Sequence, residues 1–260
     1  MIDAKFRNPI LCVPENRQGR DFFVGDIHGE KDLLFALLEK SGFDRTSDRV
    51  FSVGDLIDRG PDSFACLKLA REPWFFPCLG NHEWMLLTCG ENQSLLETTW
   101  LPNGGHWWTT ISYEEKLEAT SIIMEHMSLA IEVLSKGKKL GVIHGNIPEG
   151  YNWDRVKTLL VEDEVFFNSC IWGRQRVEQR IKTHIDGIDA VVFGHTPLDK
   201  VLKLGNCLFI DTGACYATSS IVSHPALTLV RWENGYWHCS QLKKESNDFR
   251  QGKLTFPIPS

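Results

Sequence analysis

The chain has 260 residues, of which 42% are hydrophobic and 24% charged, as in ordinary globular proteins. This length allows one large domain or two small ones. The net charge of -6 argues against a general affinity for nucleic acid or for an anionic membrane, although local basic residues could still bind one phosphate.

We expect neither a membrane-spanning helix nor a secretory signal. No stretch approaches the roughly 18 consecutive apolar residues of a membrane-spanning helix, and residues 1–10 have no apolar segment typical of a secretory signal. The eight cysteines are scattered and form no C-x-x-C pair, which is typical of free thiols in a reducing compartment. We therefore expect a cytoplasmic protein with neither a nucleic acid nor a membrane as partner.

The chain begins with a segment, 1–19, that prolines and a glycine predict to be irregular. The apolar run 21–24 then predicts a strand. A leucine stripe over 33–38 predicts a helix that buries one face, and Gly42 is expected to end it. Between this strand and this helix lies a loop with the sequence GDIHG.

Two similar units follow. The first has a strand at 49–53 and a helix capped by Ser63. The second has a strand at 74–79, in which Pro77 indicates a sheet edge or an irregularity, and an apolar helix after the sequence GNHE. Three strand–loop–helix units in a row predict an α/β fold with sites at the carboxyl ends of the strands.

Aromatic residues are frequent between 90 and 128, where the pattern is mostly helical. After this region β structure dominates, with a hairpin over 129–145 and another around Asn234-Gly235. Further strands are predicted at 189–195, 206–213 and 226–232. Without repeats or linker-like segments, we expect one domain over 1–260.

Metal-binding side chains, each close to a glycine, follow five of these strands. They are Asp26, His28, Asp55, Asn81, His144 and His195. Glycine allows sharp turns or positive φ, so such side chains can point into a shared crevice. Oxygen and imidazole ligands suit manganese, iron or zinc. Six ligands, with one carboxylate shared, predict two divalent ions about 3.5–4 Å apart and a hydroxide between them.

Five motifs in fixed order carry a family resemblance: GDIHG, GDLIDRGPDS, GNHE, HGN and GHTP, followed by LFIDTG, over residues 25–213. The chain resembles the calcineurin-like metallophosphoesterases, and among them the small bacterial and phage serine/threonine phosphatases. The resemblance implies a four-layer α/β/β/α sandwich and a manganese-dependent phosphatase. Its substrates would be phosphoserine and phosphothreonine, and also phosphotyrosine, in a phosphoprotein or phosphopeptide. The implied reaction is an in-line attack by a metal-bridging hydroxide.

The resemblance also implies a role for each site residue. One metal would be held by Asp26, His28 and Asp55. The other would be held by Asp55, Asn81, His144 and His195. His82 would be the general acid, oriented by Asp58, and Arg59 and Arg174 would hold the phosphate. Arg176 is an alternative to Arg174 in that role.

Two other functions remain open at this point. Diadenosine tetraphosphate hydrolases of the same superfamily tend to have leucine where this chain has Leu79, but they generally lack an aspartate at the position of Asp58. A non-enzymatic scaffold with the same fold is opposed by the complete ligand set. His106, Trp107 and Trp108 are interpreted either as packing residues or as a substrate platform.

Overall fold

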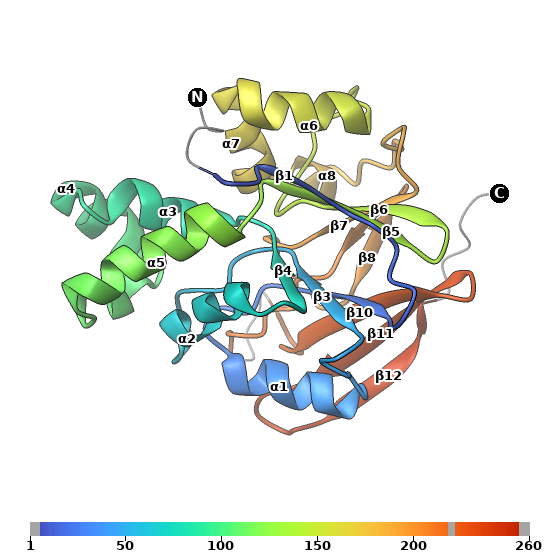
Figure 1. The fold of residues 1–260 in the computed structure, drawn as a ribbon, viewed down its shortest axis with the longest axis horizontal. Coiled ribbons are helices and arrows are strands. Elements are labelled where there is room, and N and C mark those ends of the chain that lie inside the picture. The colour runs from blue at the N-terminus through green and yellow to red at the C-terminus, as the bar shows by residue number, and fades with distance from the viewer. Residues whose placement is uncertain (1–5, 218–221, 255–260) are drawn as a thin grey trace.

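A computed structural model describes residues 6–217 and 222–254, in which two six-stranded sheets pack face to face between helices (Figure 1). In Figure 1, α6 and α7 lie above one sheet and α1 lies below the other. The predicted four-layer α/β/β/α arrangement is therefore confirmed. In the part of the chain that the structure describes, no helix combines the length and the hydrophobicity needed to cross a membrane.

The first sheet has the strand order β1-β5-β6-β7-β9-β8. Its strands are Ile10–Val13 (β1), Ala130–Ser135 (β5), Lys138–Val142 (β6), Ala190–Phe193 (β7), Leu202–Leu204 (β8) and Cys207–Phe209 (β9). The hairpin β5–β6 is antiparallel, as predicted, whereas β6, β7 and β9 are parallel.

The second sheet has the order β12-β11-β10-β2-β3-β4. Its strands are Asp21–Val24 (β2), Arg49–Ser52 (β3), Phe75–Pro77 (β4), Leu227–Glu233 (β10), Tyr236–Leu242 (β11) and Phe249–Leu254 (β12). The parallel trio β2, β3 and β4 continues into an antiparallel meander. Pro77 lies in the edge strand β4, as predicted, where its missing N–H costs no ladder hydrogen bond.

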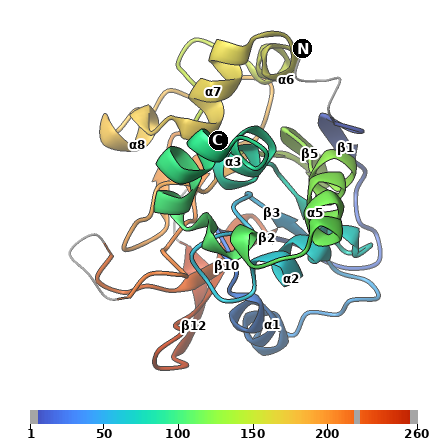
Figure 2. The same cartoon turned by 90° about the vertical axis from the view of Figure 1, so that its left-hand side faces the viewer.

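Helices cover the outer faces and one end of the layers. They are α1 (Lys31–Lys40), α2 (Ser63–Lys68), α3 (Asn81–Cys89), α4 (Gln93–Leu95), α5 (Tyr113–His126), α6 (Trp153–Glu162), α7 (Glu164–Trp172) and α8 (Gln175–Glu178). Short 3-10 or π turns lie at Leu69–Arg71, Leu96–Trp100, Leu101–Asn103 and Gly105–Thr109. Figure 2 looks onto the end of the layers, with α3 and α5 toward the viewer.

Both faces of the central strands are buried, which explains why they appear in the sequence as continuous apolar runs. In β2, Phe23 points into the core between the two sheets, whereas Phe22 packs in the core beneath the helices. Phe23 stacks on Phe51 of the neighbouring strand β3, with 5.4 Å between the ring centroids. These contacts fix the registers that bring the strand ends together.

Two local predictions were wrong. Residues 1–5 lie outside the described part of the chain, but Ile10–Val13 of the segment expected to be irregular form β1. The strand forms because it pairs in parallel with Ala130–Val133, which are distant in sequence. Ser63 does not cap α2, since Asp62 holds the N-cap position. The hydroxyl of Ser63 instead accepts the backbone N–H of Asp58 at 2.8 Å.

Candidate metal centre

The carboxyl ends of strands from both sheets converge on one buried cluster. All six predicted ligands lie there with at most 7% of their surface exposed: Asp26, His28, Asp55, Asn81, His144 and His195. They follow β2, β3 and β4 of one sheet and β6 and β7 of the other. The structure therefore places the six residues where parallel strands of two sheets end.

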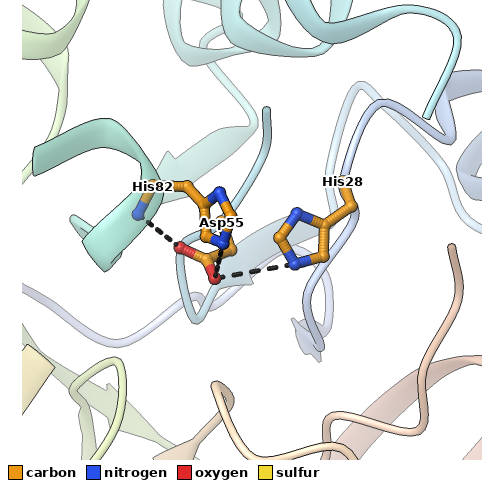
Figure 3. A group of neighbouring side chains, drawn as sticks. All are labelled: His28, Asp55 and His82. Carbon is orange, nitrogen blue, oxygen red and sulfur yellow. Dashed lines mark hydrogen bonds and ion pairs between the residues drawn. The ribbon is translucent and has the colours of Figure 1, made fainter. Parts of the chain in front are cut away.

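The carboxylate of Asp55 lies between the rings of His28 and His82 (Figure 3) and close to that of His144. Its Oδ2 atom is 3.3 Å from Nε2 of His144, 3.6 Å from Nε2 of His28 and 3.8 Å from Nε2 of His82. Two groups of potential ligand atoms, each spanning less than 4.8 Å, share this residue: one contains His28 and His82, the other His144 and His195. A carboxylate common to two groups is suited to bridge two cations.

Two histidines are held in the orientation that a metal ligand needs. Nδ1 of His28 donates to the carbonyl of Ile57 at 2.8 Å, and Nδ1 of His144 donates to the carbonyl of Val53 at 2.9 Å. Because a carbonyl only accepts, each bond fixes the Nδ1 proton and directs Nε2 toward Asp55. Such bonds from the second ring nitrogen are usual for metal-bound histidines.

Asp26 and Asn81 complete the cluster from its sides. Both carboxylate oxygens of Asp26 accept the backbone N–H of His195, at 3.0 and 3.1 Å. The amide oxygen of Asn81 lies 2.9 Å from Nε2 of His144. Oxygen and nitrogen atoms with lone pairs therefore converge from separate strands, which is the donor chemistry that a divalent cation requires.

Glycines of the ligand loops adopt positive φ as expected, with 72° at Gly29 and 103° at Gly54, and three of the ligands adopt the left-handed conformation as well. The φ angles are 46° at His28, 52° at Asp55 and 67° at His195. Gly80 instead provides space, since a Cβ atom there would lie 2.1 Å from Oδ1 of Asp55. Strained backbone at several non-glycine residues is typical of functional sites.

Glu83 joins two of the ligand loops. Its carboxylate accepts the backbone N–H groups of Gly80 at 2.9 Å, Asp55 at 3.0 Å and Leu56 at 2.7 Å. This role of Glu83 was not predicted from the sequence. The signal was present, because a glutamate at the third position of a helix commonly bonds back to the N-cap backbone.

The electrostatics of the cluster favour bound cations. Burial raises the pKa of Asp26 well above its usual value. Burial acts in the same direction on Asp55, but the facing His144 outweighs it and holds the pKa of Asp55 well below its usual range. Burial lowers the pKa of His28 well below its ordinary value and that of His195 to about 3. The neutral imidazoles of His28 and His195 are ready to bind a metal. Burial lowers the pKa of His144 too, but the facing Asp55 outweighs it and raises this pKa to about 9, so a cation that binds there must displace a proton.

A cavity of about 180 Å³ opens onto the cluster. It is lined by Asp55, Arg59, Asn81, His82, Asn103, Trp172, Arg174, His195 and Tyr216. Arg59 and Arg174 were expected here, whereas Asn103, Trp172 and Tyr216 were missed. The cavity combines two guanidinium groups with the metal-binding face, as a site for a phosphate requires.

The structure also places the residues whose roles were open. Arg174 lines the cavity, but Arg176 is buried, and its Nε donates to the carbonyl of Ile147 at 2.6 Å. Leu79 is buried in the hydrophobic core. His106 is exposed and is not among the residues that line the cavity.

His82 and Asp58 form a buried pair beside the cavity. Nδ1 of His82 lies 2.6 Å from Oδ2 of Asp58. This bond leaves Nε2 of His82 on the side of the carboxylate of Asp55, 3.8 Å away. The sequence motifs GDLIDRG and GNHE thus bring together a histidine that lines the cavity and a buried carboxylate behind it.

Comparison with known proteins assigns the family. The sequence profile described as calcineurin-like phosphoesterase matches residues 22–199. Serine/threonine-protein phosphatase 1 of Salmonella typhimurium is 37% identical over 196 residues, which are 74% of this chain and 86% of that protein. A symmetrical bis(5'-nucleosyl)-tetraphosphatase of Dechloromonas aromatica is 46% identical over 72 residues, 27% of this chain and 26% of that protein.

Solved structures support the fold. A serine/threonine protein phosphatase from Saccharomyces cerevisiae superposes with a TM-score of 0.55 at 15% sequence identity. The match covers 98% of this chain and 88% of that one.

Proposed function

Because the chain belongs to the calcineurin-like phosphoesterase family and is a metallophosphoesterase, we propose that it is a serine/threonine protein phosphatase. Its substrates are phosphoserine and phosphothreonine in proteins, with phosphotyrosine as a further substrate. The name and the 37% identity of the Salmonella typhimurium relative support this proposal. A cytoplasmic location, supported by the scattered cysteines, belongs to the same proposal.

The observation that carries the proposal is the pair of His82 and Asp58, 2.6 Å apart. Hydrolysis of a phosphoserine releases an alkoxide, which is a poor leaving group. A general acid that protonates it contributes about 10²–10⁴-fold to the rate. His82 gives this proton from Nε2, and Asp58 stabilises the ring through Nδ1 and holds its orientation.

Six residues would hold the metal ions: Asp26, His28, Asp55, Asn81, His144 and His195. Asp55 would be the ligand common to both ions, since it belongs to both groups of candidate ligands. Two divalent ions, most simply Mn²⁺ with iron and zinc as alternatives, supply Lewis-acid activation of the attacking water and of the phosphate when bound. Arg59 and Arg174 bind the phosphate oxygens and neutralise their charge, since both line the cavity.

Hydrolysis of dinucleoside polyphosphates is the second candidate function. The local 46% identity to the Dechloromonas aromatica tetraphosphatase favours it. Leu79 was the sequence feature that favoured this function, but its side chain lies in the core and is not among the residues that line the cavity. The pair of His82 and Asp58 argues against this function, because a general acid is needed to protonate an alkoxide leaving group.

The test is phosphate release from a phosphoserine peptide and turnover of diadenosine tetraphosphate, measured side by side with Mn²⁺ and with a chelator. We expect Mn²⁺-dependent turnover of the peptide at a kcat/KM well above that of the dinucleotide. Preference for the dinucleotide would replace the proposal with the second candidate. Turnover of neither substrate would favour a scaffold.

A further inference from the structure

We propose that Trp100 and Trp107 are positioning residues for the general acid: their indole N–H groups hold Asp58 in the orientation that directs His82 at the leaving group. This inference rests on the proposed phosphomonoesterase function and adds two residues to it. The tryptophans come from a segment, 100–107, that follows α4 and lies about 40 residues after Asp58.

The carboxylate of Asp58 accepts bonds from three rings. Oδ1 accepts from Nε1 of Trp107 at 2.6 Å. Oδ2 accepts from Nε1 of Trp100 at 2.7 Å and pairs with Nδ1 of His82 at 2.6 Å. Both oxygens are therefore used, and the carboxylate is completely buried. Short hydrogen bonds to an ionised group are among the strongest in proteins.

The segment that carries the tryptophans closes over the turn that carries Asp58. This turn is strained, with φ of 74° at Asp58 and 68° at Arg59. The N–H of Arg59 donates to the carbonyl of Gly104 at 3.3 Å, so the two segments are joined through their backbones. A Cβ atom at residue 105 would lie 2.6 Å from Nε1 of Trp100, so Gly105 gives the indole access to the carboxylate.

Each indole has a consequence for the reaction. A carboxylate held at both oxygens cannot rotate about its Cβ–Cγ bond without breaking a buried hydrogen bond, which is costly. The ring of His82 is held in turn, because its Nδ1 bonds to one of these oxygens. Loss of an indole donor should therefore weaken proton delivery and leave phosphate binding intact. The effect should be large only where the leaving group needs a proton.

Trp108 provides a matched control. It is a buried indole of the same cluster, 5.3 Å from Trp100 and 5.8 Å from Trp107 between ring centroids. Its Nε1, however, donates to the carbonyl of Gly90 at 3.1 Å and not to Asp58. Replacement by phenylalanine removes an indole N–H at all three positions with a similar loss of ring volume.

The experiment measures kcat for a series of substituted phenyl phosphates, from good to poor leaving groups, with Trp100→Phe, Trp107→Phe and Trp108→Phe. We expect the first two variants to lose about tenfold with the poorest leaving group, the value of one hydrogen bond to a charged group, and about twofold with the best. Trp108→Phe should match the wild type across the series. Equal losses for all leaving groups would overturn the inference. So would a loss in Trp108→Phe that depends on the leaving group in the same way as in the other two variants.

A spectroscopic measurement covers the case in which Trp100→Phe does not fold. In the ¹H–¹⁵N spectrum, Asp58→Asn should move the indole N–H signals of Trp100 and Trp107 and leave that of Trp108 in place. Unchanged signals for both tryptophans would contradict the inference. The phenyl phosphate series also separates the two proposals, because it needs no phosphopeptide turnover. An enzyme that hydrolyses dinucleotides instead would refute the proposed substrate. The dependence of kcat on the leaving group of the phenyl phosphates would still decide the role of the tryptophans. No turnover of any phosphate ester would refute both.

Discussion

Arg174 and Arg176 are two positions apart, yet their side chains lie in different environments. Arg174 lines the cavity, with Nε 3.3 Å from Nε2 of His195. Arg176 is 1% exposed, and its guanidinium donates to the carbonyls of Ile147 at 2.6 Å and Thr183 at 2.9 Å. One arginine is thus available to a substrate, and the other is used by the fold.

This difference predicts opposite phenotypes for two alanine variants. Arg174→Ala should lower kcat/KM for a phosphomonoester by about 10–100-fold, because a charged hydrogen bond to phosphate is lost, and leave the Tm unchanged. Arg176→Ala should lower the free energy of unfolding by about 3 kcal/mol, since two buried carbonyls lose their donors. Steady-state kinetics and thermal unfolding of both variants test this. A stability loss in Arg174→Ala without a kinetic effect would contradict the assignment.

Glu83 predicts a link between the loops and metal affinity. Glu83→Gln replaces one acceptor oxygen by an NH₂ group that faces backbone N–H donors. We expect metal affinity to fall about 10–100-fold, as for other residues that orient ligands. Burial raises the pKa of Glu83 to about 7, so calorimetric metal titration should be done at pH 8, where the carboxylate is ionised.

Glu115 is the matched control for this variant. It occupies the same position in α5, where its carboxylate accepts the N–H of Ser112 at 2.8 Å, but it is only half-buried and not among the residues that line the cavity. Glu115→Gln should therefore leave metal affinity at the wild-type value. A similar loss in both variants would mean that helix capping, and not the joining of the ligand loops, matters at Glu83.

The role of His82 predicts a dependence on the leaving group. His82→Asn keeps a polar side chain of similar shape, but the amide has no ionisable group that could give a proton to the leaving oxygen as Nε2 of His82 does. Turnover of a phosphoserine peptide should fall by about 10²–10⁴-fold, whereas an aryl phosphate with a good leaving group should lose far less. The measurement is kcat on both substrates with saturating Mn²⁺. Equal losses on the two substrates would refute the general-acid role.

Asp211 predicts the pH dependence of stability in the metal-free protein. Burial, together with repulsion from Asp55, raises the pKa of Asp211 to about 6. A raised pKa means that the folded state binds the proton more tightly than the unfolded state, so stability from this group is lost as the pH rises through 6. Asp211→Asn, which can still accept the N–H of Gly213, removes this loss. Denaturant unfolding in chelator should show the variant gaining up to about 3 kcal/mol over wild type between pH 4 and pH 7.

Asp199 provides a control of opposite sign. Hydrogen bonds from Ser223 lower the pKa of its exposed carboxyl, so its contribution to stability is present at neutral pH and is lost on acidification. Asp199→Asn should therefore be less stable than wild type at pH 7, and the difference should shrink as the pH falls. If both variants changed in the same direction with pH, the burial of Asp211 would not be the cause.

The sequence predicted much of the fold because the relevant signals are local. The buried strands β2, β3 and β7 are continuous apolar runs, and the residues that follow each run are fixed in place once the strand forms. The chain order of Asp26, Asp55 and His195 therefore sufficed to predict one cluster at the strand ends. The strand β1 could not be predicted in this way, because four residues between prolines form a strand only when β5 is beside them.

The sequence by itself thus determined which residues reach the candidate metal-binding cluster, since a strand carries its last residues to the edge of the sheet. Only the tertiary structure decided which side chains outside this cluster line the cavity or form hydrogen bonds to its residues. Arg174 and Arg176 look equivalent in the sequence IWGRQR, and nothing in the sequence links Trp100 or Trp107 to Asp58. The direction of an arginine after a helix and the approach of a distant indole depend on packing between segments. That packing is a property of the folded chain as a whole.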